Sequence, residues 1–415
     1  MEPVKETQVN SSHIALLDIK DEDNLLKHAE INILESEKRA NGPLHVRDHY
    51  MVYLIDVKVT DEHFQLLQHK ISSLWRRYTE FEQLHDYLQL TYPHVVMPPL
   101  PEKRILYSWQ KSDTLSPEFV DRRRAGLENF LLRVAAHPAL CRDTHFLGFL
   151  QMEHGWRETV METGYMVLAE KKLKSLTIAI RLKNPDAKFE MIKAYGKQLE
   201  SSLNNLLFTR SKMVEKQHTL CKLHANYGKL FSEWSVIEKE MGDGFQKAGH
   251  YFDSIAESID SILEDEEQYA DQLKEYLFFA EALQNVCRHH EALQLAVETS
   301  EECLTSRVAE RERAAAGKSG LMSRLFGTTD PDIVRDQTCR TLDSKITSDR
   351  TAIQKAHEEL KDFTEKALAD VERFQKQKDK DLQETLAGYV VLQVKNARKG
   401  LQTWTQVKEC LDGIS

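Results

Sequence analysis

The sequence predicts an α+β domain at the N-terminal side, followed by an all-α region of three long helices. Of the ten prolines, eight fall within the first 138 residues, and the other two are Pro185 and Pro331. Glycine is absent from residues 250–316 and 328–387. Long stretches without either residue, rich in Glu, Lys, Gln, Leu and Ala, are typical of long helices. The frequent breakers of the first part indicate a mixed domain.

Three segments of the first part have the composition of β-strands. Residues 29–34, 50–56 and 72–78 are rich in β-branched and aromatic residues. The Asn-Gly-Pro sequence at residues 41–43 is a turn signal between the first two. We therefore expect three strands before the first helices.

Two helices are predicted to follow the strands. Apolar residues recur at helical spacing from Phe81 to Leu88. A second helix is expected over residues 118–135, because Ser116 is a good N-cap and Pro117 suits the first helical position.

The second half of the chain carries apolar residues in steps of three and four. The stripe of the middle helix comprises Ile255, Ile259, Ile262, Tyr269, Leu273, Tyr276, Ala280, Leu283, Cys287 and Val297. Polar residues interrupt this stripe at Glu266, His290 and Gln294, and a similar stripe in the last helix is interrupted at Asp349 and Asp370. The pattern is typical of a coiled-coil or bundle seam.

The length of the middle helix predicts an association between chains. One helix over residues 247–312 would be about 99 Å long at 1.5 Å per residue. Such a helix cannot bury its stripe within a compact monomer. It needs equally long neighbours, which favours a second chain.

Composition excludes several classes of protein. The sequence has no run of eighteen apolar residues, which argues against a transmembrane helix, and its polar, acidic first residues argue against secretion. The six cysteines are scattered without a CxxC pair, which favours a reducing cytosolic compartment. The net charge of −10 argues against broad nucleic-acid binding, so an anionic partner needs a local basic site.

The motifs of common enzymes are also missing from the sequence. It has no P-loop, no G-x-S-x-G and no H-E-x-x-H motif. We interpret the pair His289-His290 and the acidic run 260–267 as solvated helix surfaces, since neither has a metal-ligand pattern. The expectation is a protein that is not an enzyme and has no cofactor and no metal.

Three basic clusters in the first part are candidates for anion binding. They lie within residues 75–81, 98–104 and 121–124, and they contain Arg76-Arg77-Tyr78, Lys103-Arg104 and Arg122-Arg123-Arg124. Guanidinium groups match phosphate oxygens, and a lysine adds a point charge. Each cluster alone could equally be a solvated strand or helix end. The prolines of residues 98–101 also allow an SH3 ligand.

The order and spacing of these clusters resemble a phox-homology (PX) domain over about residues 25–154. The resemblance implies a three-stranded antiparallel sheet with helices and a site for phosphatidylinositol 3-phosphate. In it, Arg77 would hold the 3-phosphate, Tyr78 would lie under the inositol ring, Lys103 would bind near the 1-phosphate and Arg123 would bond the 4- and 5-hydroxyls. Arg76 matches a structural position, and Arg122 and Arg124 are expected on other faces of their helix.

A short apolar segment follows the lysine of this predicted site. Ile105, Leu106, Tyr107 and Trp109 match the membrane-insertion loop of the family, although they could instead pack back on the domain. Two other segments could touch membrane: residues 168–182, which could equally be a linker packed on the helices, and residues 318–327, which could be an exposed loop.

From about residue 25 to the end, the chain resembles the PX-BAR sorting nexins, on the strength of residues 226–235, 238–244 and 264–277. The acidic composition of residues 1–24 indicates a disordered tail. The resemblance implies a PX domain at 25–154, a linker at 155–185 with a candidate amphipathic helix, and a BAR domain at 186–415. The three BAR helices would form a curved dimer, either a homodimer or a heterodimer with another PX-BAR sorting nexin.

The function implied by this resemblance is curvature-sensing binding to the cytosolic face of early endosomes. It would serve endosomal sorting and recycling and also autophagy. Cargo or motor adaptors would be further partners, and nucleic acid is not expected to be a partner. An alternative is a lipid-anchored coiled-coil tether or scaffold without curvature sensing, because the apolar stripe alone does not distinguish the two.

Overall fold

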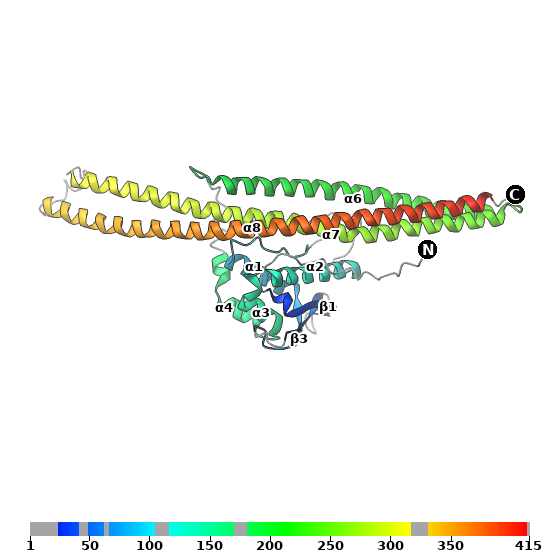
Figure 1. Cartoon of the computed structure of the whole chain (residues 1–415), viewed down its shortest axis with the longest axis horizontal. Helices are drawn as coiled ribbons and strands as arrows, with labels where there is room; N and C mark the ends of the chain where they lie inside the picture. Colours follow the sequence, from blue (N-terminus) through cyan, green and yellow to red (C-terminus); the bar gives the residue numbers. More distant parts are fainter. Residues whose placement is uncertain are drawn as a thin grey trace.

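A computed structural model describes residues 24–40, 49–61, 66–103, 116–169, 181–316 and 331–412. It comprises an α/β lobe that lies against the middle of a bundle of long helices (Figure 1). Helix α2 of the lobe runs beside the bundle, and the sheet lies on the side of the lobe away from it. The N-terminal tail, the apolar segment with Ile105, Leu106, Tyr107 and Trp109, and residues 318–327 lie outside the described residues, as does most of 168–182.

The sheet of the lobe contains strands β1 (Ala29–Ala40), β2 (His49–Val59) and β3 (Ile71–Arg77). They are antiparallel in the order β1-β2-β3, and a bulge between Ile33 and Glu35 shifts the first pair. All three predicted strands are therefore present. The third ends one residue earlier than expected, because Tyr78 begins the next helix.

The helices of the lobe are α1 (Tyr78–Thr91), α2 (Pro117–Ala136), α3 (Thr144–Gln151) and α4 (Trp156–Glu162), with short 3-10 turns η1 (Leu25–Lys27) and η2 (Leu140–Arg142). The hydroxyl of Ser116 accepts the N–H of Phe119, so the predicted cap of α2 is confirmed. Fully buried side chains of the sheet and helices form one core, among them Tyr53, Ile55, Phe81, Leu84, Leu127, Phe130 and Phe149.

The bundle consists of α6 (Ala187–Ser235), α7 (Gly242–Ala315) and α8 (Pro331–Asp412). Helix α7 packs between α6 and α8, and beyond the start of α6 only α7 and α8 continue as a two-helix arm (Figure 1). The carboxylate of Asp186 caps α6 by accepting the N–H groups of Lys188 and Phe189. With 74 residues, α7 exceeds the predicted span at both ends.

Two glycines allow α6 and α7 to approach closely. A Cβ atom added to Gly228 would lie 2.8 Å from the carboxylate carbon of Asp253 and 3.0 Å from the carbonyl oxygen of Gly249. One added to Gly249 would lie 2.9 Å from the carbonyl oxygen of Gly228. Any larger residue at either position would push the helices apart.

Three of the polar interruptions of the apolar stripes, Glu266, His290 and Asp370, are buried contacts, and this corrects two expectations. His290 is not on a solvated surface: it is 2% exposed, stacks on Phe189 and lies 3.2 Å from the hydroxyl of Thr364. In the acidic run, Glu266 is 3% exposed and accepts a hydrogen bond from Gln393. Periodicity marks such positions as exceptions, but only packing shows that they have partners.

Candidate functional site

The four predicted site residues come from three segments of the lobe. Arg77 ends β3 and Tyr78 begins α1, so they flank the sharp turn from strand to helix. The carboxylate of Glu80 accepts the N–H of Arg77 at 2.8 Å and holds this turn. Lys103 follows the proline-rich loop, and Arg123 lies in the second turn of α2.

Three of the four side chains meet at the ring of Tyr78. The Arg123 guanidinium lies 5.1 Å from the ring centroid, and Nζ of Lys103 lies 6.0 Å from it. The Tyr78 hydroxyl donates to the carbonyl oxygen of Pro101 at 2.7 Å, and Arg123 donates to that of Lys103 at 2.9 Å. These bonds join the proline-rich loop to α1 and α2, so an aromatic ring faces two cations.

Arg77 lies beside this group but has a different aromatic neighbour. Its guanidinium lies 3.4 Å from the ring centroid of Tyr50 on β2. The sequence motif did not point to Tyr50. The sheet register does, because Arg77 pairs with Val52, and Tyr50 is two residues away on the same face.

The charges around Tyr78 are partly satisfied within the protein. Lys103 is 63% exposed and forms a 2.5 Å ion pair with Glu82, another residue that the motif did not indicate. Burial, reinforced by Glu82, raises the pKa of Tyr78, so its hydroxyl stays protonated. Burial also raises the pKa of the neighbouring Tyr53, while the charge of Arg123 opposes this change.

Arg76, next to the site, holds the lobe together. Its guanidinium is almost fully buried, lies over the rings of Phe149 and Trp156, and donates to the carbonyl oxygens of Phe149 and Met152. The structural role expected for Arg76 is confirmed. Two adjacent arginines thus have opposite environments, because successive residues of a strand point to opposite faces.

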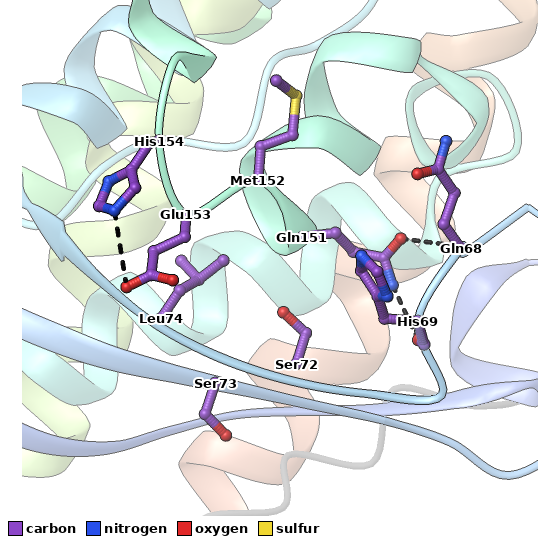
Figure 2. A pocket seen from close by; sticks show the side chains of 9 residues that line it. All are labelled: Gln68, His69, Ser72, Ser73, Leu74, Gln151, Met152, Glu153 and His154. Atoms are coloured by element: carbon purple, nitrogen blue, oxygen red, sulfur yellow. Dashed lines mark hydrogen bonds and ion pairs between the residues drawn. The ribbon is translucent and has the colours of Figure 1, made fainter.

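A separate pocket of the lobe lies away from the four predicted site residues. It has a volume of about 450 Å³ and is lined by Gln68, His69, Ser72, Ser73, Leu74, Gln151, Met152, Glu153 and His154 (Figure 2). The side-chain amide of Gln151 spans its rim, accepting from the N–H of Gln68 and donating to the carbonyl oxygen of His69. None of the four predicted site residues lines it.

Polar and charged side chains join the lobe to the bundle. Arg122 donates to Asp271 of α7 at 2.7 Å, and Arg133 donates to Glu275 of α7 and Asp381 of α8. Because Arg124 instead donates to the carbonyl oxygen of Ile33 on β1, the prediction that Arg122 and Arg124 leave the site face is confirmed.

A second set of contacts closes this junction near α8. The carboxylate of Asp370 accepts the N–H of Val96 at 2.7 Å and lies 2.8 Å from Nε2 of His137. Nδ1 of His137 accepts the N–H groups of Ala139 and Leu140, so Nε2 carries the proton. Burial would raise the pKa of Asp370, but the His137 hydrogen bond and the charge of Arg373 lower it to about 2.

The bundle leaves many apolar side chains uncovered. Those exposed by 45% or more along the C-terminal parts of α6 and α8 are Leu206, Phe208, Met213, Leu220, Leu223, Tyr227, Leu230, Trp234, Leu386, Val390, Val391, Val394, Leu401 and Trp404. We call this set the open face. So much exposed apolar surface is unusual for a monomer and marks an association surface. In the described part of the chain, no helix is both long and apolar enough to span a bilayer.

Comparison with known proteins agrees with this architecture. Residues 65–153 match the family model of the PX domain. Sorting nexin-4 of Mus musculus and that of Homo sapiens are each 46% identical over 394 residues, which is 93% of this chain and 87% of theirs. The structure of the SNX-BAR Mvp1 tetramer covers 91% of this chain and 99% of its own, with a TM-score of 0.62 and 16% identity.

The lobe and the bundle thus have the fold of a PX domain joined to a BAR-type helical domain. The identity to sorting nexin-4 extends over nearly the whole chain, well beyond the PX domain. The chain belongs to the sorting nexin family.

Proposed function

We propose that the chain binds phosphatidylinositol 3-phosphate through Arg77, Tyr78, Lys103 and Arg123. We propose further that, as a curvature-sensing dimer, it serves endosomal sorting and recycling and also autophagy. The observation that carries this proposal is the convergence of Lys103 and Arg123 on the ring of Tyr78, beside Arg77. The PX match and the membership in the sorting nexin family support it.

Each of the four side chains has a chemical role in this proposal. Arg77 bonds the 3-phosphate, because a guanidinium fork matches phosphate oxygens. The face of Tyr78 packs under the inositol ring, Lys103 supplies a point charge near the 1-phosphate, and Arg123 bonds the 4- and 5-hydroxyls. A headgroup phosphate would compete with Glu82 for Lys103, whose exposed ion pair is weak.

The open face supports the proposed dimer. A second copy, or another PX-BAR sorting nexin, would cover apolar side chains of α6 and α8 and leave the two-helix arms projecting outwards. Two PX domains on one rigid dimer bind a membrane as an avid pair, because the second contact is effectively intramolecular. The proposed location is the cytosolic face of early endosomes, with cargo or motor adaptors as further partners.

Liposome co-sedimentation of the full chain tests this function. Vesicles of several diameters are compared with and without phosphatidylinositol 3-phosphate. We expect binding to require the lipid and to increase as the diameter falls. Binding that depends on the lipid but not on the diameter would favour a tether over a curvature sensor.

Single substitutions test the site itself. We expect Arg77→Ala to reduce binding to lipid-containing vesicles by at least about 30-fold, since a phosphate loses a charge-assisted contact worth roughly 2 kcal/mol. Lys103→Ala should reduce it less, because only one exposed point charge is lost. The matched control is Arg157→Ala, which removes an exposed cation from α4 of the same domain. Unchanged binding by Arg77→Ala would contradict the assignment of the site.

A further inference from the structure

The two segments that bring cations to Tyr78 are each joined to helix α7 by the preceding residue. Glu102, directly before Lys103, forms a 3.0 Å ion pair with Lys274. Arg122, directly before Arg123, donates to Asp271 at 2.7 Å. The loop that carries Lys103 and the helix that carries Arg123 are therefore both bonded to the same turn of α7. We call this loop and this helix the two walls of the candidate site.

Ion pairs within α7 link these two anchors. Nζ of Lys274 lies 3.5 Å from the carboxylate of Asp271. Glu102, Lys274, Asp271 and Arg122 thus form a continuous chain of charges, which we call the ion-pair quartet. At the site itself, the two segments also contact each other directly, because Arg123 donates a hydrogen bond to the carbonyl oxygen of Lys103 at 2.9 Å.

Burial distinguishes one pair of the quartet, Lys274 with Glu102, from an ordinary surface ion pair, whereas Arg122 and Asp271 are 27% and 37% exposed. The side chains of Lys274 and Glu102 are 5% and 11% exposed. Arg122 is further fixed by Glu267, whose carboxylate lies 3.0 Å away. Breaking a desolvated pair leaves an uncompensated charge, so the position of its partners is strongly constrained.

The walls of the site are already in contact, which makes their spacing sensitive to small shifts. A Cβ atom on Gly126 of α2 would lie 2.7 Å from the Cβ atom of Pro101. The proline-rich loop and helix α2 are therefore in direct contact, with no room for a side chain between them. A change at the quartet would alter the distance between Lys103 and Arg123.

We infer that helix α7 of the BAR domain positions the headgroup site of the PX domain through the ion-pair quartet, an inference that rests on the function proposed above. Lys274 and Asp271 are positioning residues, since they act on the headgroup only through Glu102 and Arg122. By linkage, a headgroup bound at the site strengthens the contact between the two domains by the same factor.

Calorimetric titration of the full chain with inositol 1,3-bisphosphate tests this inference. The soluble headgroup removes the contributions of avidity and curvature. We expect Lys274→Met to weaken binding about 10-fold, within the usual range of coupling between sites. Lys274→Arg, which keeps the charge, should stay within about 2-fold of the wild type.

A double substitution separates positioning from a general loss of structure. Replacing both partners, as in Glu102→Gln with Lys274→Met, leaves no buried charge unpaired. We expect its loss of affinity to be smaller than the product of the two single losses. The control is Lys378→Met, which removes a mostly buried lysine of α8 that bonds Tyr195 within the bundle, and it should leave headgroup binding unchanged.

The outcomes distinguish the inference from the function on which it rests. If Arg77→Ala abolishes headgroup binding while Lys274→Met binds as the wild type does, the positioning role is wrong and the proposed function stands. Independent, multiplicative losses in the double variant would also overturn it. A wild-type chain that does not bind the headgroup would overturn both.

Discussion

The bundle has two association surfaces of opposite chemistry. Toward the PX domain it presents buried charges, with Arg133 bonded to Glu275 and Asp381. On the open face it presents exposed apolar side chains such as Leu230 and Trp404. The charged surface lies on α7 and α8 and the open face on α6 and α8, so α8 contributes to both.

The charged surface fixes an orientation, whereas the apolar face supplies affinity. Hydrogen bonds and ion pairs are satisfied in only one geometry, so the junction sets how the PX domain lies on the bundle. Its net contribution to stability is small while intact, because desolvation offsets most of the attraction. Apolar burial is non-directional and favourable in proportion to area, which suits the joining of two separate chains.

Removing one partner at the charged junction should have the largest effect. We expect Glu275→Leu to destabilise the docked PX domain by about 3–5 kcal/mol, because Arg133 then keeps a buried charge with one carboxylate fewer. Hydrogen exchange of the α2 amides measures this loss, with Glu281→Leu, at an exposed position of α7, as the control. A loss below about 1 kcal/mol would mean that the pair behaves as a surface ion pair.

A charge on the open face should have the next largest effect. Trp404 contacts Phe252 and is 47% exposed, so in a dimer Trp404→Glu would bury a carboxylate among apolar groups. We expect the dimer to weaken by about 2–4 kcal/mol, as for a central interface residue. Sedimentation velocity measures the dissociation constant. Met191→Glu is the matched control, because Met191 is exposed near the N-terminus of α6, outside the open face. Equal effects at both positions would contradict this assignment of the interface.

Acidification should produce the smallest effect, through His137 and His94 at the junction and through His224 and His290 in the bundle, whose pKa values burial also lowers. Burial lowers the pKa of His137 below 6.5, and it lowers that of His94 in the same way. Below pH 6.5 the unfolded chain therefore binds more protons than the folded one, and stability falls as the pH falls. Asp370, whose pKa is about 2, loses its contribution only in stronger acid.

Thermal unfolding at pH 7.5, 6.5 and 5.5 measures this dependence. We expect the unfolding temperature to depend less on pH in His137→Gln. In His154→Gln, whose side chain is 91% exposed, the dependence on pH should persist. The dimer constant should not change over the same range if the open face is apolar. If the unfolding temperature depends on pH equally in both variants, His137 is not the residue that causes this dependence.

The sequence predicted the fold class and the positions of the main elements, but β1 extends six residues beyond its predicted end and α7 exceeds its predicted span at both ends. Capping by Ser116 and Asp186 is a local property, so both helix starts were predictable. The third strand ended one residue early because its end depends on the bond between Arg77 and Glu80. The family motif also located Arg77, Tyr78, Lys103 and Arg123, although their roles in lipid binding stay predictions.

The tertiary structure decided which polar residues have partners. Glu266, His290 and Asp370 interrupt a periodic stripe in the sequence, and that pattern could not distinguish a solvated residue from a buried contact. The partner of Asp370, His137, is 233 positions away. Local periodicity reports which face of a helix is apolar, but a hydrogen bond between distant segments exists only once both have been brought together by folding.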